Sequence, residues 1–343
     1  MPAPPTILIT GANGEIGHGL IEHLSASGGV RLIALDVRPL DPDLQARCYR
    51  SVTGDILEPD LLNRLSAEHD FSAVYHLAAV LSTKAERQPG LGHRVNVDGT
   101  LNLLEMAAEQ ARRDGRDITF LFPSSIAVYG LPDLERKRAA GAVKETDWCE
   151  PRTMYGVNKL YCEQLGRYYA NYYRQLDQQP PAGRVDFRGL RFPGLISAAT
   201  LPTGGTSDYA PEMLHQAAQG LRYHCFVRRD TRIPFMAMPD AIQALLRLAA
   251  APRERLSRYV YNIGAFSPSA AELEALLRES FPDMQVDFLP DARRQAIVDS
   301  WPEAVDDSAA RADWGWAARY DLRAAFETYL IPAVRQRYGR APA

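Results

Sequence analysis

The chain has 343 residues and a formal net charge of −3, enough length for a large buried core and for one domain with a smaller companion. Its 39 Lys and Arg residues are not gathered densely enough in any stretch to neutralise a phosphate backbone, so we exclude nucleic acid as a partner. No run of about 18 consecutive apolar residues predicts a membrane span, and no basic region followed by an apolar run opens the chain, so we expect a cytoplasmic protein without a membrane partner.

Short β-branched or apolar runs alternate with segments of helical periodicity through the first half of the chain. The predicted strands are residues 6–10, 31–36, 73–79, 119–125 and 185–192, and the predicted helices include 15–27, 91–113 and 154–176. Such alternation is typical of βαβ units with a parallel sheet, and helices of this length cover both of its faces. The sequence therefore predicts an α/β fold, a doubly wound parallel sheet of the Rossmann type.

The second half of the chain follows a different pattern. After Phe192 the segments become rich in Gly, Pro and Thr, although 239–250 and 259–264 are predicted as a helix and a strand that return to the sheet. We expect a first domain over 1–190 with a return segment at 236–264, and a smaller interleaved α/β domain over 191–235 and 265–335. Ser269-Ala-Ala-Glu272 predicts a capped helix, and Asp321 is expected to cap the last one. Polar segments at 131–149 and 177–184 are interpreted as surface excursions.

A glycine loop, Gly11-Ala-Asn13-Gly14-Glu15-Ile16-Gly17, follows the first strand and opens a helix, which is the setting that a dinucleotide phosphate requires. Gly11 permits the tight turn, Gly14 lets the backbone approach the pyrophosphate, and Gly17 lets helix pack on strand. Asp36 ends the next strand, where a carboxylate can bind both ribose hydroxyls and repel a 2′-phosphate. The pattern predicts NAD as cofactor, and an ordinary turn cap is the alternative for Asp36.

Two later strand ends extend the predicted cofactor site. Asp55 and Ile56 follow the third strand, and the aspartate is a candidate to bind the adenine amino group. Leu77, Ala78 and Ala79 follow His76 at the end of the fourth strand, where they allow a cofactor to lie against backbone. Plain core packing is the alternative for this last group.

Catalytic residues are predicted from a tyrosine and a lysine in Tyr155-Gly-Val-Asn-Lys159, because residues four apart share one helix face. A neighbouring ammonium and a positive nicotinamide both favour the phenolate, which makes Tyr155 a candidate general base. Ser124 and Ser125 end the preceding strand, where open α/β sheets bind ligands and a hydroxyl can hold the reacting oxygen. We assign Ser125 to catalysis and Ser124 to substrate binding, although the sequence does not decide which one contacts the reacting oxygen.

These motifs, together with Arg94-Val-Asn-Val-Asp-Gly99, resemble the extended short-chain dehydrogenase/reductase family, which includes UDP-galactose 4-epimerase. The resemblance covers nearly the whole chain. It implies an NAD-binding Rossmann domain with an interleaved substrate domain and places Asn96 near the cofactor. It also implies a homodimer formed through the two long helices at 91–113 and 154–176.

Four blocks of the second half resemble one group of that family, the epimerase-type L-threonine 3-dehydrogenases. They are Leu190-Arg-Phe-Pro-Gly-Leu-Ile-Ser197, Gly204-Gly-Thr-Ser-Asp-Tyr-Ala210, Pro234-Phe-Met-Ala-Met-Pro-Asp-Ala241 and the stretch from Ser300 to Trp316. This resemblance places Phe192 and Leu195 beside the nicotinamide. It makes the following residues candidates for the amino acid pocket: Ser82, Thr206, Ser207, Asp208 and Trp301. A zwitterion needs hydroxyl donors and an ammonium acceptor; we assign the acceptor to Asp208, with a turn aspartate as its alternative, and Trp301 either excludes water or anchors the tail.

The predicted reaction is NAD-dependent oxidation of the 3-hydroxyl of L-threonine to L-2-amino-3-oxobutanoate. Because 131–149 and 177–184 are longer than that group usually shows, another β-hydroxy amino acid or a small sugar acid is an alternative substrate. A nucleotide-sugar 4-epimerase is a further alternative. A dehydratase would need an acid beside Ser125, where Ile126 stands, and a redox-sensing regulator would tend to lose the Tyr/Lys pair. The four scattered cysteines and the absence of H-E-x-x-H predict reduced thiols and no metal site.

Overall fold

The computed structural model describes residues 4–178, 182–202 and 204–339, and the chain divides into two compact units that interleave along the sequence. Unit 1 comprises Met1–Ser124, Val157–Leu190 and Leu245–Tyr261; unit 2 comprises Ser125–Gly156, Arg191–Ala244 and Asn262–Ala343. This division differs from the predicted domains, because residues 125–156 belong to unit 2 and the return segment is shorter. The reason lies in their contacts: Leu131 N donates to Ser300 O (2.8 Å) and Lys137 Nζ to Val298 O (2.9 Å).

Unit 1 is built on a seven-stranded sheet with the order β11-β7-β5-β4-β1-β2-β3. The pairs β1–β2, β1–β4, β2–β3 and β4–β5 are parallel, so crossover helices must connect them. The strands are β1 (Thr6–Thr10), β2 (Arg31–Asp36), β3 (Arg50–Thr53), β4 (Phe71–His76), β5 (Ile118–Ser125), β7 (Val185–Phe192) and β11 (Val260–Asn262). The predicted doubly wound α/β fold is confirmed.

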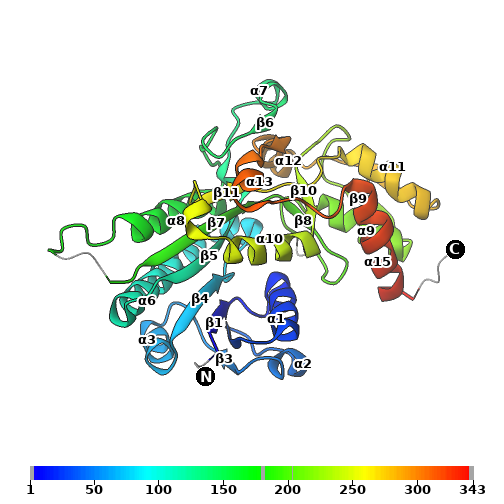
Figure 1. The fold of residues 1–343 in the computed structure, drawn as a ribbon. Coiled ribbons are helices and arrows are strands. Elements are labelled where there is room, and N and C mark those ends of the chain that lie inside the picture. The colour runs from blue at the N-terminus through cyan, green and yellow to red at the C-terminus, as the bar shows by residue number, and fades with distance from the viewer. Residues whose placement is uncertain (1–3, 179–181, 203, 340–343) are drawn as a thin grey trace. The chain divides into compact units, whose positions relative to one another are not determined.

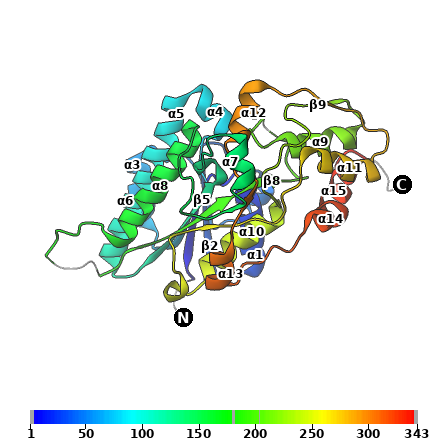
Figure 2. The ribbon, with the colours of Figure 1, turned by 90° about the horizontal axis from the view of Figure 1, so that it is seen from above.

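Helices cover both faces of this sheet, with α3, α6 and α8 on one side and α1 on the other (Figures 1 and 2). The connecting helices are α1 (Glu15–Ser27), α2 (Pro42–Gln45), α3 (Pro59–Glu68), α4 (Ser82–Arg87), α5 (Pro89–His93), the π-helical η1 (Arg94–Asp98), α6 (Gly99–Asp114), α8 (Met154–Asn171), α10 (Met238–Ala250) and η3 (Arg253–Arg255). α10 crosses the boundary between the units, since its first half belongs to unit 2.

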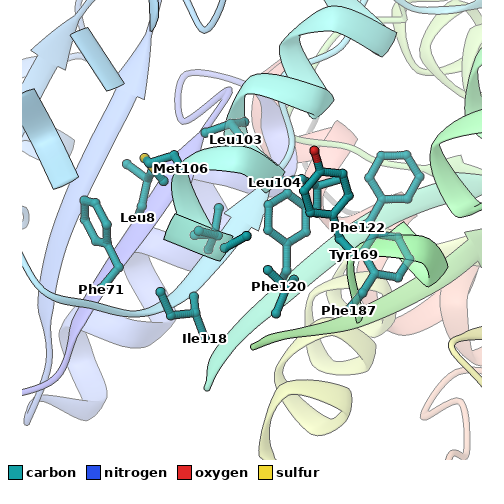
Figure 3. Packing of buried hydrophobic residues seen from close by; sticks show 14 of the residues in the cluster. Leu8, Phe71, Leu103, Leu104, Met106, Ile118, Phe120, Phe122, Tyr169 and Phe187 are labelled. Atoms are coloured by element: carbon teal, nitrogen blue, oxygen red, sulfur yellow. The ribbon is translucent and has the colours of Figure 1, made fainter. Parts of the chain in front are cut away.

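The core of unit 1 lies between the sheet and the helices α3, α6 and α8. Phe120, Phe122 and Phe187 form its aromatic part, with ring centroids 5.6 to 5.9 Å apart (Figure 3). Gly166 of α8 packs directly on the ring of Phe187, where a side chain would clash. This contact seats α8 on the sheet, which matters because α8 carries the predicted catalytic pair.

Unit 2 consists of short strand pairs and helices. Its elements are η2 (Ile126–Val128), α7 (Leu134–Ala139), β6 (Ala142–Val143), β8 (Gly194–Ile196), α9 (Tyr209–Gln219), β9 (Tyr223–Cys225), β10 (Phe235–Ala237), α11 (Ala270–Ser280), β12 (Val286–Phe288), α12 (Ala292–Asp299), β13 (Ala304–Val305), α13 (Ser308–Trp314), α14 (Leu322–Ala324), η4 (Ala325–Leu330) and α15 (Ile331–Arg337). The strands pair in parallel as β8–β10, β9–β12 and β6–β13. The predicted caps are confirmed: Ser269 and Glu272 form a capping box, and Asp321 accepts from Ala324 N.

Three sequence-based expectations need correction. The fourth strand ends at His76, because the backbone after it turns towards Gly11, and the predicted helix 91–113 is interrupted by the π-helical turn η1. α8 ends at Asn171 rather than at residue 176. Segment 131–149 is mostly exposed, as expected of a surface excursion, and Leu131, Lys137 and Val143 anchor it as buried residues. Segment 177–184 lies partly outside the described residues. Within the described residues, no helix is both long and apolar enough for a membrane span.

Candidate active site

The glycine loop of unit 1 joins β1 to α1 and packs tightly against the end of β4. Gly11 has φ +66°, and a Cβ on it would lie 2.5 Å from Ala78 N, so no side chain fits there. A Cβ on Gly17 would lie 2.5 Å from Ala12 O, which shows how closely α1 approaches the loop. α1 begins after Gly14, whose position provides no side-chain cap for the first-turn amides. Uncapped amides at a helix N-terminus suit a diphosphate, so this loop fits the phosphates of NAD.

Asp36 at the end of β2 ties the glycine loop to the sheet. Its Oδ2 accepts from Asn13 N and its Oδ1 from Arg38 N, both at 3.0 Å. Asp36 therefore does cap the turn after β2, as the alternative interpretation of this residue predicts. A carboxylate offers about four acceptor positions, so these two bonds leave capacity for ribose hydroxyls. Asp55 is also used locally, because its Oδ1 accepts from Leu57 N at 3.0 Å.

A directional chain of hydrogen bonds crosses the end of β4 at the buried His76. Thr100 donates its hydroxyl to Asn96 O (2.6 Å), so it accepts from His76 Nε2 (2.9 Å), which leaves His76 Nδ1 to accept from Thr10 Oγ1 (2.9 Å). Burial, and then the charge of Lys159, lower the pKa of His76 to about 3. The imidazole is therefore neutral at physiological pH and links β1, β4 and α6.

The side chain of Asn96 is used within the protein. It is buried, accepts from Val80 N (2.7 Å) and donates to Val80 O (3.0 Å). The oxygen and the nitrogen of the Asn96 amide therefore both bond to the backbone of Val80, in the way that a neighbouring strand would. These two bonds fix Val80, the residue that follows Leu77, Ala78 and Ala79. Asn96 therefore supports the backbone segment 77–79, which packs against Gly11.

The two serines at the end of β5 have different surroundings. Ser124 is buried, and its Oγ donates to Glu163 Oε1 at 2.5 Å. Ser125 is partly exposed, and its Oγ accepts from Ala127 N at 3.1 Å as the N-cap of η2. A hydroxyl that accepts this bond keeps its proton for another acceptor. The hydroxyl of Ser125, unlike that of Ser124, is thus suited to a reacting oxygen.

The first turns of α8, which carry Tyr155 and Lys159, lie beside the end of β5, and two contacts set the position of the helix. In unit 2, Gly156 lies so close to Ala127 O that a side chain there is excluded, and Thr153 Oγ1 accepts from Gly156 N at 3.1 Å. In unit 1, Lys159 Nζ donates to Pro123 O at 2.6 Å. The tyrosine and the lysine therefore begin a helix that is held at the residues flanking the serine pair.

Burial shifts the pKa values of both catalytic candidates. Burial raises the pKa of Tyr155 above its usual value, which differs from the lowering predicted for a base. Burial lowers the pKa of Lys159 to about 8, and nearby Cys162 and Glu163 act in the opposite direction. The lysine can thus lose its proton within the range where enzymes work, and the tyrosine needs positive charge near it to become a base.

The predicted amino acid loop of unit 2 is held in place by two partners. Asp208 Oδ2 accepts from Gly205 N at 2.6 Å, and Arg294 Nη2 donates to Gly205 O at 2.7 Å. Asp208 is therefore a turn aspartate, as its structural alternative predicts. Thr206 is buried and Ser207 is partly exposed. Ser207 Cβ lies 3.4 Å from where a Cβ on Gly194 would stand, so this loop lies beside the start of β8, which carries Leu195.

The remaining predicted residues lie in both units. Phe192 is buried at the end of β7, Leu195 is partly exposed, and Ser82 begins α4. Trp301 is 4% exposed and follows Ser300, whose carbonyl anchors Leu131; burial to this extent favours the anchoring interpretation. Sequence reasoning missed Glu163 and Arg294, whose roles depend on contacts with Ser124 and Gly205 that no local motif signals.

Comparisons with known proteins extend over both units. The NAD dependent epimerase/dehydratase family matches residues 7–264. The mitochondrial L-threonine 3-dehydrogenase of Bos taurus is 37% identical over 94% of this chain and 81% of its own length. The holo form of the GalE-like L-threonine dehydrogenase from Cupriavidus necator is 36% identical with a TM-score of 0.81, covering 97% of this chain and 100% of that chain. A monomeric L-threonine 3-dehydrogenase from a metagenome is 35% identical with a TM-score of 0.82, covering 97% and 99%.

Proposed function

The chain belongs to the NAD dependent epimerase/dehydratase family and is an NAD-dependent dehydrogenase, and we propose that it oxidises the 3-hydroxyl of L-threonine to L-2-amino-3-oxobutanoate. One observation carries the catalytic part of this proposal. Lys159 Nζ lies 2.6 Å from Pro123 O, which brings the Tyr/Lys helix to the serine-bearing end of β5. The relatives named L-threonine 3-dehydrogenase support the choice of substrate.

The proton transfer is assigned to Tyr155. Burial holds the proton on its phenol, so the phenolate must be favoured by two positive charges, the Lys159 ammonium and the oxidised nicotinamide. Tyr155 then removes the hydroxyl proton of the substrate, and Ser125 donates a hydrogen bond that holds the reacting oxygen. Bound NAD would supply the acceptor for the hydride that leaves C3. Ser124 is left with a supporting role, because its hydroxyl is engaged by Glu163.

The proposed cofactor site uses the glycine loop for the diphosphate and Asp36 for the ribose hydroxyls. Leu77, Ala78 and Ala79 would line the adjoining wall, with Asp55 and Ile56 at the adenine end. Phe192 and Leu195 are proposed beside the nicotinamide. The negative charge of Asp36 favours NAD over NADP, since a 2′-phosphate would be repelled.

For the substrate, we propose that Thr206 and Ser207 bind the carboxylate of threonine and that Asp208 accepts from its ammonium group. The carboxylate of Asp208 accepts one hydrogen bond from Gly205 N, and a carboxylate can accept several. Ser82, Trp301 and Ser124 are further candidates for this pocket.

The test is the formation of NADH by the purified protein with a panel of substrates. L-Threonine, other β-hydroxy amino acids and small sugar acids are compared at equal concentration, and UDP-galactose is assayed separately for conversion to UDP-glucose. We expect the highest kcat/KM with L-threonine and no sugar conversion. A higher value with a sugar acid, or any UDP-glucose, would replace L-threonine as the assigned substrate.

We further propose a homodimer in the cytoplasm. The exposed side of α8 carries Val157, Tyr161 and Tyr168 at helical spacing that lines them along one face. Tyr172 follows the last residue of the helix, and all four side chains are more than 40% exposed. Apolar and tyrosine side chains in this arrangement are typical of an interface between subunits. Because one similar structure is described as monomeric, measuring the oligomeric state of this protein in solution tests the proposed dimer directly.

A further inference from the structure

A buried carboxylate stands one helical turn after the catalytic lysine. Glu163 of α8 is 0% exposed and Lys159 is 5% exposed. Residues four apart on a helix point to the same side, and both side chains reach β5: Glu163 accepts from Ser124 Oγ, and Lys159 donates to Pro123 O. The ammonium and the carboxylate therefore share the buried space between α8 and the last residues of β5.

Besides the Pro123 carbonyl, an aromatic ring lies near the Lys159 ammonium. Its Nζ lies 4.5 Å from the centroid of the Phe122 ring, which gives a modest cation–π attraction. His76 of β4 is neutral, so it adds no second positive charge beside the ammonium. On α8 itself the titratable neighbours are Tyr155 and Cys162, and burial raises the pKa of the Cys162 thiol to about 11, so that it stays uncharged at neutral pH. Glu163 thus supplies negative charge on the same helix face as the ammonium.

We propose that Glu163, oriented by the Ser124 hydroxyl, is a positioning residue that keeps Lys159 charged in the active site. This inference rests on the proposed function, in which the Lys159 ammonium favours the Tyr155 phenolate. It also gives Ser124 a role of its own: its hydroxyl satisfies one oxygen of a carboxylate that burial would otherwise destabilise. Burial alone pulls the lysine towards the neutral form, and the carboxylate opposes it.

The composition of the chain makes a direct test possible, because it contains only four lysines: Lys84, Lys137, Lys144 and Lys159. Lys84 and Lys144 are exposed. Lys137 is a matched control, since it is also buried, its Nζ donates to Val298 O (2.9 Å), and burial lowers its pKa to about 8. It belongs to unit 2, whereas Glu163 belongs to unit 1. Protein labelled with ¹³C at lysine Cε should give four signals, assigned by Lys→Arg and Lys159→Met variants and titrated by NMR.

In Glu163→Gln, which keeps the size and the acceptor for Ser124, the pKa of Lys159 should fall by about one unit or more, while that of Lys137 stays unchanged. Ser124→Ala should lower the Lys159 pKa by less, because the carboxylate remains. Glu163→Asp should restore most of the wild-type value. An unchanged Lys159 pKa in folded Glu163→Gln, or an equal shift of Lys137, would overturn the proposal. If Glu163→Gln does not fold, the Ser124→Ala and Glu163→Asp titrations decide in its place.

A second measurement connects the charge to turnover. Lys159 must be protonated to act, so activity is present below its pKa and is lost as the pH rises through it. The alkaline limb of the kcat/KM profile should therefore move to lower pH in Glu163→Gln by the shift seen in the NMR titration. A purely structural defect would lower activity at all pH values without moving this limb. The NMR titration needs no substrate, so it stands even if the protein proves not to oxidise L-threonine.

Discussion

Asp208 offers a test that separates recognition of the substrate from support of a loop. Its carboxylate accepts from Gly205 N at 2.6 Å, while Arg294 holds Gly205 O at 2.7 Å. If Asp208 also accepts from the substrate ammonium, Asp208→Asn removes the charge but leaves a carbonyl oxygen for Gly205 N. The turn should therefore persist, and the loss should fall on substrates that carry an amino group.

The expected loss follows from the kind of bond. A hydrogen bond to a charged group contributes about 1.5 to 3 kcal/mol, which corresponds to roughly 10- to 150-fold in kcat/KM. We expect this loss for L-threonine, with no change in the Kd for NAD. 3-Hydroxybutyrate lacks the amino group, so it should be a poor substrate of the wild type and lose little more in Asp208→Asn.

Arg294→Met provides the control, because it removes the donor to Gly205 O and leaves the Asp208 carboxylate in place, while its side chain can still pack on the ring of Phe226. It should reduce kcat/KM for both substrates by the same factor, about 5-fold for one hydrogen bond. The assay is steady-state NADH formation with both substrates and three proteins. Equal losses for threonine and 3-hydroxybutyrate in Asp208→Asn would refute the assigned contact and leave Asp208 as a loop residue.

Three other variants test the base, the cofactor preference and the proposed dimer. Tyr155→Phe should lower kcat by a factor on the order of 10² or more with an unchanged Kd for NAD, because only the proton acceptor is lost; retained turnover in a steady-state assay would remove Tyr155 as the base. Asp36→Ala should reduce the preference for NAD over NADP in kcat/KM, and a wild type that prefers NADP would contradict the interpretation of β2. Tyr161→Glu with Tyr168→Glu should convert a dimer to a monomer in sedimentation velocity, since two buried charges would be unpaired; a monomeric wild type would rule out the dimer.

The elements of unit 1 were predictable because local signals agree with the tertiary fold. β1, β2, β7 and α1 have the bounds that periodicity predicts, since buried parallel strands are continuous apolar runs and glycine marks the loop between β1 and α1. The end of β4 was not predictable, because the close approach of Gly11 to Ala78 that ends the strand joins residues far apart in the chain. The π-helical turn η1 has no sequence signature of its own in this chain.

In the candidate site too, some features could be predicted from the sequence and others could not. Spacing alone brings Tyr155 and Lys159 to one helix face, and the strand end places the serine pair, so these residues could be read from the sequence. The difference between Ser124 and Ser125 could not, because it depends on Glu163, 39 residues beyond Ser124. The role of 131–149 was also hidden: its polar composition predicts a surface loop, yet Lys137 is buried with its ammonium on a carbonyl of α12.

α8 unites these observations, because one helix carries Tyr155, Lys159 and Glu163. Glycines rather than side chains seat it, since Gly156 meets the Ala127 carbonyl and Gly166 meets the ring of Phe187. Backbone contacts of this kind leave little room for a shift of the helix, so base, ammonium and carboxylate keep their spacing. The loop at Gly205 that we assign to the substrate is fixed by its own partners, Asp208 and Arg294. We therefore expect substitutions in that loop to change which alcohol is accepted without displacing Tyr155 and Lys159, the residues to which we assign proton transfer.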